Sequence, residues 1–364
     1  MKNKELTLRA ISLLEEMISI PAPSTKEEAR STFLRKKIHG ILMDEGLVDK
    51  VFEAQVKNNI LLYSPDKGKK TLLMCAHIDT VKPSEGFSPS PVWKGGKLYG
   101  LGTNDDGGCM VCMLEAFLRH AKAVGGCSLL LALTAEEENG GQNGLPVVLE
   151  YIKAQKVIPM PDYALVGEPT GMKAAIGEKG LLVLDATSKG TLSHAAHPGQ
   201  DNAIYNALKD IETLRKLNFR RKSDVTGPTH LSVTQINAGS AHNIVPDICT
   251  FVVDIRFNEK YTPEEILKTL SAKTASSLKA RNLKHRCCVT PAGSPLLETV
   301  QELGIETYVS PTSSDWARLP VPAIKIGPGE STRSHKAGEH ITKSEIAGGI
   351  KGYSLILKHL QTKL

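Results

Sequence analysis

Imidazole and carboxylate side chains follow directly on short apolar segments at four places in the 364-residue chain. Both kinds of side chain bind divalent metal ions, and a carboxylate can also act as a general base. Segments this short and this continuously apolar are typical of strands buried on both faces. The four places are 71–76 before His77 and Asp79, 128–134 before Glu136, Glu137 and Glu138, 163–167 before Glu168, and 321–326 before the loop of His335.

The carboxyl ends of these strands are where such side chains can meet. Ligands of open α/β sheets bind at that edge, so residues far apart in the sequence converge there. A lone His-x-Asp or a run of glutamates is more often structural. Three carboxylates at the end of an apolar segment, however, repel one another and lose water unless a cation is present. Their position therefore favours a metal site.

A fifth segment, 100–108 (GLGTNDDGG), is a glycine-rich loop that leads into a helical pattern. A phosphate cradle is one interpretation of this loop. It has neither the GxGxxG spacing after a strand nor the lysine of a Walker motif, and the adjacent carboxylates of Asp105 and Asp106 would repel a phosphate. A cation is therefore the better ligand.

Together these segments supply two imidazoles and three or four carboxylates, without a thiolate. Nitrogen and oxygen donors of this kind suit zinc, cobalt or manganese. One ion would leave ligands unused, whereas two ions bridged by one carboxylate use all of them and activate a water at neutral pH. We therefore expect two divalent ions per chain, zinc in the first place and cobalt or manganese as alternatives.

Strand and helix alternate around these residues. The first 46 residues predict two helices, and the second is expected to begin at position 24 or 25, with Glu27 and Glu28 placed for a capping box. Further helical patterns lie between the apolar segments, at 108–123 and 145–155. This order predicts an α/β fold with an open mixed sheet flanked by helices.

The middle of the chain has a different order, βαββαβ, which is that of a ferredoxin-like α+β sandwich. After this segment the strand and helix pattern of the first part of the chain returns. A strand is predicted at 321–326, and a helix is predicted to begin in a capping box at Thr342. We therefore expect a catalytic domain formed by 1–177 and 291–364, with a smaller domain inserted at 178–290. The elements predicted for the insertion are 180–187, 203–217, 230–236, 249–257, 263–281 and 285–290.

Composition excludes several classes of protein. Hydrophobic residues make up 41% and charged residues 23% of the chain, as in folded globular proteins. The net charge of +6 is dispersed, so we expect no nucleic acid partner. The longest apolar segment is far below the roughly 18 residues of a membrane span, and no secretory signal is visible, so we expect a cytoplasmic chain. The seven cysteines favour buried thiols, and Cys109-x-x-Cys112 lies in a helical pattern that indicates packing.

The motifs of the chain resemble those of the M20 metallopeptidase family, specifically its acetylornithine deacetylase and succinyl-diaminopimelate desuccinylase branch. They are spread over nearly the whole chain and occur in the family's order. They are Ala76–Thr80 (AHIDT), the loop 100–108, Thr134–Gly141 (TAEEENGG), Val166–Thr170 (VGEPT), Gly190–Ile204 around Ser193-His194, Asp254-Ile255-Arg256, and His335 with Glu339.

The resemblance implies a role for each metal-competent residue. The family commonly has a lysine or similar residue soon after its bridging aspartate, whereas this chain has two glycines after Asp106. Counting from Gly102 puts Asp105 in register as the bridge, with Asp106 as the second choice. The implied ligands are His77 and Glu168 for one ion, Glu138 and His335 for the other, and Asp105 between them, with Asp79 orienting His77 and Glu137 as the general base.

For the inserted domain the resemblance implies a lid or dimerisation role in a homodimer. His194 matches a histidine that in dimeric relatives reaches the partner's active site and helps to stabilise the oxyanion. The alternative is a surface loop, in which His197 is the better candidate for a satisfied surface imidazole. Asn243 and Arg256 match residues that hold the substrate, and Arg256 would offer a planar fork to a carboxylate. The alternative interpretation of Arg256 is an arginine on the surface at the end of a strand.

The expected activity is removal of an acetyl or succinyl group from an ornithine- or citrulline-like amino acid in arginine biosynthesis. The segment 327–335 (GPGESTRSH) and the compact chain favour this substrate by analogy with the family. A succinyl-diaminopimelate desuccinylase, or a dipeptidase or aminopeptidase of the same family, is the alternative enzyme. A catalytically silent metal-binding scaffold is the alternative from another class, and the intact Glu137 argues against it.

Overall fold

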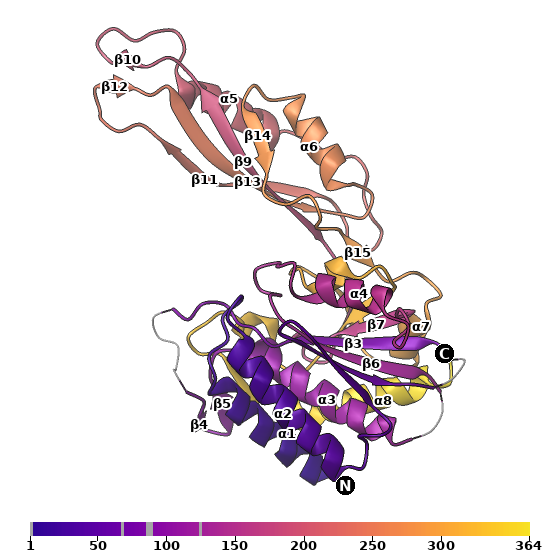
Figure 1. Cartoon of the computed structure of the whole chain (residues 1–364). Coiled ribbons are helices and arrows are strands. Elements are labelled where there is room, and N and C mark those ends of the chain that lie inside the picture. Colours follow the sequence, from indigo (N-terminus) through magenta and orange to yellow (C-terminus); the bar gives the residue numbers. More distant parts are fainter. Residues whose placement is uncertain (1–2, 67–68, 85–89, 124–125) are drawn as a thin grey trace. The chain divides into compact units, whose positions relative to one another are not determined.

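The computed structural model describes residues 3–66, 69–84, 90–123 and 126–364. The chain divides into two compact units (Figure 1). The larger unit comprises Met1–Ile176, Thr290–Tyr308 and Ser314–Leu364, and the smaller unit comprises Gly177–Val289 and Val309–Ser313. No helix in the described ranges is long and apolar enough to cross a membrane.

A mixed sheet of nine strands forms the centre of the larger unit (Figure 1). In sheet order its strands are β1 (Phe52–Val56), β2 (Asn59–Ser64), β6 (Ser128–Thr134), β3 (Thr71–His77), β7 (Tyr163–Val166), β17 (Ala323–Lys325), β8 (Ala174–Glu178) and β15 (Cys288–Val289), with β16 (Thr307–Ser310) beside β8. The neighbours β6, β3, β7 and β17 run parallel, and antiparallel strands extend the sheet on both sides. β3 and β6 are buried along their whole length, which explains their continuously apolar sequences.

Helices cover both faces of this sheet. On one face α1 (Asn3–Ile18), α3 (Gly108–Ala121) and α8 (Lys343–Leu360) pack against one another, and α4 (Leu145–Ala154) lies on the opposite face (Figure 1). The predicted α/β architecture, an open mixed sheet flanked by helices, is confirmed.

Both cysteines of the Cys-x-x-Cys pair lie buried in α3. The remaining elements of this unit are α2 (Glu28–Asp44), α7 (Pro295–Glu302), the short helical turns Thr103–Gly107, Asp315–Arg318 and Ser331–Arg333, and a small sheet of β4 (Val92–Lys94), β5 (Lys97–Tyr99) and β18 (His340–Thr342).

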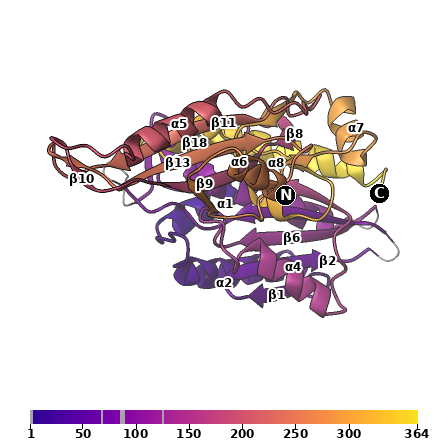
Figure 2. The ribbon, with the colours of Figure 1, turned by 90° about the horizontal axis from the view of Figure 1, so that it is seen from above.

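The smaller unit is the expected ferredoxin-like sandwich. Its elements follow the order β9 (Gly180–Lys189), α5 (Ala203–Arg215), β11 (His230–Ala238), β13 (Ile248–Phe257), α6 (Pro263–Ser271) and β14 (Ser277–Ala280). The strands form an antiparallel sheet in the order β11-β13-β9-β14. Side chains of α5 and α6 share one apolar core with alternate residues of β9 and β13. A short ribbon of β10 (Ser193–His194) and β12 (Ile244–Val245) lies at one end of the unit (Figure 1; β10 is also labelled in Figure 2).

Two predicted elements of the smaller unit are wrong. The helix expected at 263–281 ends at Ser271, and β14 follows it within the same segment. The strand expected at 285–290 is not the fourth strand of the sandwich, because its ordered part, β15, pairs with β8. β14 takes the fourth position by pairing with β9.

A carboxylate from another helix accounts for the early end of α6. Asp210 of α5 is buried, and it accepts hydrogen bonds from the backbone N–H groups of Ala275 at 3.1 Å and Ser276 at 2.7 Å. It also accepts the Ser276 hydroxyl at 2.6 Å. These two N–H groups are therefore not free to continue the hydrogen bonds of a helix.

The start of α2 also differs from the prediction. The helix begins at Glu28, and Glu27 makes no cap with its side chain. Glu27 Oε1 instead accepts the backbone N–H groups of Thr25 at 2.6 Å and of Glu136, a residue distant in the sequence, at 3.2 Å. The capping box expected at Thr342 is present at the start of α8.

Candidate metal centre

The predicted ligands of the larger unit follow the ends of the four parallel strands. β3 ends at His77, which lies beside Thr134 at the end of β6, and Glu136–Glu138 follow that strand at once. β7 and β17 extend the same parallel set, so Glu168 and the loop of His335 emerge at the same edge of the sheet. Residues distant in sequence therefore meet at one place.

Asp105 faces both histidines of the site. Its Oδ1 lies 3.1 Å from His77 Nε2, and its Oδ2 lies 3.5 Å from His335 Nε2. His335 Nε2 also lies 2.9 Å from the Glu138 carboxylate. A carboxylate that directs one oxygen to each of two imidazoles has the arrangement that a bridge between two metal ions requires.

Asp106 points elsewhere, so it is the weaker candidate for the bridge. Its Oδ2 accepts the backbone N–H of His77 at 3.2 Å, and its Oδ1 is buried without a hydrogen-bond partner in the described structure. Burial raises the pKa of Asp106 to about 7, and the charge of Asp105 adds to this shift.

The donor atoms form two overlapping groups, each within 4.8 Å: His77 with Asp105 and Glu138, and His77 with Glu137 and Glu168. Both groups contain only nitrogen and oxygen donors, which suits the divalent ions expected from the sequence. Burial raises the pKa of Glu168 well above its ordinary value, and the charge of Asp105 raises it further. Bound cations reverse such shifts, so the residues present fit a two-metal site.

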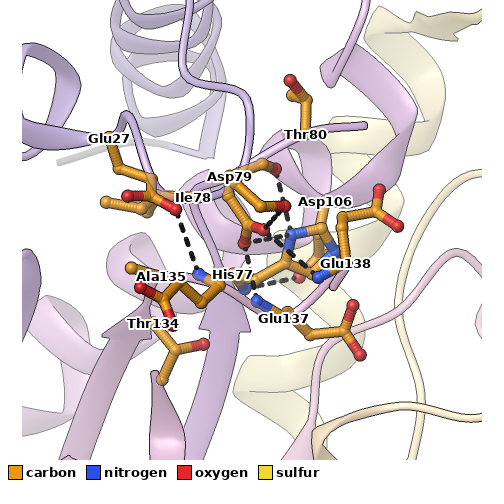
Figure 3. Close-up of polar contacts among 12 residues, drawn as sticks. Glu27, His77, Ile78, Asp79, Thr80, Asp106, Thr134, Ala135, Glu137 and Glu138 are labelled. Atoms are coloured by element: carbon orange, nitrogen blue, oxygen red, sulfur yellow. Dashed lines mark hydrogen bonds and ion pairs between the residues drawn. The ribbon is translucent and has the colours of Figure 1, made fainter. Parts of the chain in front are cut away.

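Asp79 fixes the main chain around the site (Figure 3). Its Oδ1 accepts the backbone N–H of Glu137 at 3.1 Å, and its Oδ2 accepts that of Glu138 at 3.2 Å and the Ser24 hydroxyl at 2.7 Å. Oδ1 also lies 3.4 Å from His77 Nδ1. Burial would raise the pKa of Asp79, but its contacts with His77 and Ser24 lower it overall. An ionised Asp79 thus holds both His77 and the segment that carries Glu137.

The environment of Glu137 favours proton uptake. Burial raises the pKa of this carboxyl group well above its ordinary value. His77 opposes the shift, whereas the negative charges of Asp315 and Glu138 increase it. A carboxylate with a raised pKa is a stronger base, which is what proton transfer at neutral pH requires.

Asp315 is a buried part of the site that the sequence analysis missed. Its Oδ2 accepts the Thr134 hydroxyl at 2.9 Å and the Cys75 thiol at 3.6 Å, and its Oδ1 pairs with Arg318 at 2.5 Å. It therefore joins β3 and β6 near the ends from which His77 and Glu137 emerge. Nothing in the run Ser313-Ser314-Asp315 distinguishes it from a surface loop.

The predicted residues of the smaller unit fall into two places. His194 lies on β10, and Asn243 accepts the backbone N–H of Ala195 at 2.9 Å, so these two residues are neighbours. His194 is exposed, and its Nδ1 accepts the backbone N–H of Ala196 at 3.0 Å. Arg256 lies toward the other end of β13 from Asn243.

The guanidinium of Arg256 is engaged within its own strand. Its Nε and Nη2 donate to the Asp254 carboxylate at 2.8 and 3.1 Å. A substrate carboxylate would have to compete with the Asp254 carboxylate for the same N–H groups of Arg256.

Comparison with known proteins relates both units to peptidases. Residues 176–282 match the family described as "Peptidase dimerisation domain", and residues 58–149 match "Peptidase family M28". The chain is 27% identical over 389 residues to a succinyl-diaminopimelate desuccinylase of Pelagibacter ubique, with 97% of this chain and 99% of that protein covered. It is 25% identical over 365 residues to the enzyme of that name from Anaplasma marginale, with 92% and 93% covered.

Solved structures show the same fold. An M20 family metallo-carboxypeptidase from Sulfolobus solfataricus superposes with a TM-score of 0.74 at 18% identity, with 97% of this chain and 99% of that chain covered. The aminopeptidase PepT from Bacillus cereus gives a TM-score of 0.72 at 20% identity, with 97% and 98% covered.

The inserted unit matches the dimerisation domain of M20 peptidases, and relatives aligned over nearly the whole chain bear the name succinyl-diaminopimelate desuccinylase. The resemblance found in the motifs is thereby confirmed. The chain is a metal-dependent hydrolase that acts on amide bonds.

Exchanging each of the two adjacent aspartates for asparagine tests which of them would contact both metal ions. Asp105→Asn removes the charge that faces both histidines, so we expect the affinity for both ions to fall by more than the roughly 10–100-fold that a change behind a ligand gives. Asp106→Asn is the matched control, because its amide oxygen can still accept the His77 N–H, and it should bind two ions nearly as the wild type does. Calorimetric titration of metal-free protein with zinc measures both. The reverse pattern would make Asp106 the bridge.

Proposed function

We propose that this M20 enzyme removes the succinyl group from N-succinyl-diaminopimelate. The observation that carries the proposal is that relatives covered over more than nine-tenths of their length bear the name succinyl-diaminopimelate desuccinylase. The ornithine- or citrulline-like substrate and the place in arginine biosynthesis, which the sequence analysis preferred, find no specific support among these relatives. The alternative substrate is therefore the better one.

The structure gives a packing reason for the segment that had favoured ornithine. A Cβ added at Gly327 would lie 2.4 Å from the Cys109 thiol, and one at Gly329 would lie 2.4 Å from the Asn104 side-chain oxygen. Both glycines are thus required by close packing against the segment 104–109. Their presence carries no information about the substrate.

For the metal ions we propose the arrangement implied by the motifs, with zinc as the first choice of ion. His77 and Glu168 would hold one ion, Glu138 and His335 the other, and Asp105 both. Bound there, the ions supply Lewis acidity toward the acyl carbonyl and an activated water. The two distances from Asp105 to the histidines support its place between the ions.

We assign proton transfer to Glu137. Its carboxylate would take the proton of the attacking water and return it to the leaving amine. Its position beside His77 and Glu168 in the cluster of metal-competent donors supports this role. Asp79 would keep Glu137 in place through the backbone N–H that it accepts.

We further propose a homodimer in which His194 serves the site of the partner chain. The match to a peptidase dimerisation domain supports a dimer. In the smaller unit, β11 is an edge strand, and α5 next to it exposes Tyr205 and Leu208 by 70% and 50%. An open strand edge beside exposed apolar side chains suits symmetric pairing with a second copy. Asn243 and Arg256 are proposed to hold the substrate.

A panel of N-acyl compounds tests the substrate. With zinc or cobalt added, we expect kcat/KM for N-succinyl-diaminopimelate to exceed that for N-acetylornithine, N-succinylornithine and N-acetylcitrulline by at least about 10-fold, because a missing polar contact in a substrate pocket costs that much or more. A dipeptide serves as a further comparison. Highest kcat/KM for an ornithine or citrulline derivative would restore the first expectation and refute the proposal.

Replacing the base tests the mechanism. Glu137→Gln should keep its metal content and its melting temperature but lose roughly 10²–10⁴-fold in kcat, because it can no longer accept a proton. Glu136→Gln is the neighbouring control, since the Glu136 carboxylate accepts hydrogen bonds from the backbone and side chain of Asn143, which lies outside the predicted ligand set. Its kcat should stay within about 10-fold of wild type. A Glu137→Gln enzyme with near-normal kcat would assign proton transfer to another group.

Mixing two inactive variants tests the dimer. A hybrid of Glu137→Gln and His194→Ala chains contains one site with its own Glu137 and a His194 donated by the partner. Equal mixing should therefore restore roughly a quarter of wild-type activity, since about half of the dimers are hybrid and each has one intact site. No recovery after demonstrated subunit exchange would show that His194 does not act across the interface.

A further inference from the structure

We propose that Asn104 and Glu339 form a loop clamp that positions the bridging Asp105 and the loop of His335 for the two ions. The inference rests on the two-metal site of the proposed function and concerns residues that touch no ion themselves. It makes Asn104 and Glu339 positioning residues, whose loss weakens metal binding while both histidines and all carboxylate ligands remain.

Glu339 holds the loop that carries Asp105. One carboxylate oxygen, Oε1, accepts the backbone N–H groups of Gly102 at 2.9 Å, Asn104 at 3.0 Å and Asp105 at 3.0 Å. The backbone oxygen of Glu339 also accepts the N–H of Gly100 at 3.2 Å. One acceptor oxygen thus gathers three backbone N–H groups of the same loop. Glu339 therefore fixes the direction of the main chain from which the Asp105 side chain leaves.

Asn104 makes the reciprocal connection to the loop of His335. Its Oδ1 accepts the backbone N–H of Glu330 at 3.0 Å, and its Nδ2 donates to the Glu330 carbonyl at 3.1 Å and to the Ser334 hydroxyl at 3.2 Å. Ser334 directly precedes His335. Each loop thus supplies one side chain that binds the main chain of the other, so the positions of Asp105 and His335 are linked.

The local sequence fits this clamp. Gly102 has a φ of +84°, a conformation that glycine adopts without strain, and a Cβ there would lie 2.7 Å from the Thr80 methyl group. Glu339 is 1% exposed, and its second oxygen, Oε2, is buried without a hydrogen-bond partner in the described part of the chain. A buried polar atom without a hydrogen bond lowers the stability of the folded protein. Such a group is accounted for if the hydrogen bonds made by Oε1 are needed for function.

Calorimetric titration of the metal-free, full-length protein with zinc tests the clamp without relying on activity. Glu339→Ala removes the acceptor of three N–H groups, so the affinity for both ions should fall by roughly 10–100-fold, as is usual for a residue that supports a metal ligand. Glu339→Gln keeps an oxygen in the same place and should restore affinity to within about 3-fold of wild type. Asn104→Ala leaves the Glu339 bonds to the loop intact and should weaken the ion at His335 more than the ion at His77.

A matched control separates positioning from general loss of stability. Glu115 is also 1% exposed in the larger unit, where it pairs with Arg9. Glu115→Ala should lower the melting temperature of the metal-free protein without changing the affinity for zinc. If Glu339→Ala does not fold, the Asn104→Ala and Glu339→Gln titrations decide.

Three results would overturn the clamp. One is wild-type zinc affinity in both Glu339→Ala and Asn104→Ala. Another is a Glu339→Gln protein as weak as Glu339→Ala, which would make charge rather than the acceptor position decisive. The third is equal loss of affinity in Glu115→Ala. Binding of one zinc ion or fewer per wild-type chain would refute the proposed two-metal site itself, and so the two failures are distinguishable.

Discussion

Repulsion between carboxylates at the edge of the central sheet is the constraint on which the larger unit depends. Parallel strands deliver Glu137, Glu138 and Glu168 to one place, and Asp105 joins them there. Burial raises the pKa of Glu137 and Glu168 well above the ordinary range, and their negative neighbours raise it further. Two divalent ions would offset this repulsion, whereas a neutral core could not hold so many acids in their charged form.

A second layer of acidic residues holds the first through the main chain rather than through the ions. Asp79 and Glu27 accept backbone N–H groups of the segment 136–138. Asp315 ties β3 to β6 through Cys75 and Thr134. Arginines compensate these charges: Arg318 pairs with Asp315, and Arg30, whose pKa burial lowers to about 10, donates to the carbonyl oxygen of Ile78 beside Asp79. These contacts hold the main chain around the predicted ligands without any contribution from an ion.

The sequence predicts those parts of the site that depend on local pattern. β3 and β6 were recognisable because burial on both faces demands apolar residues throughout, and the ligands follow such strands directly. Contacts between residues that are distant in the sequence could not be predicted from local pattern. Glu27 has the spacing of a capping residue, yet its carboxylate accepts the N–H of Glu136. The segment 263–281 has helical periodicity, but Asp210 from another helix ends the helix after Ser271.

The most direct test of this account is a crystal structure of the zinc-loaded enzyme with anomalous scattering recorded at the zinc edge. We expect two peaks about 3.5–4 Å apart, as in other two-metal sites, with one oxygen of Asp105 on each ion. His77 and Glu168 should complete the first site, and Glu138 and His335 the second. A single peak, or two peaks that Asp106 bridges while Asp105 contacts neither, would contradict the account.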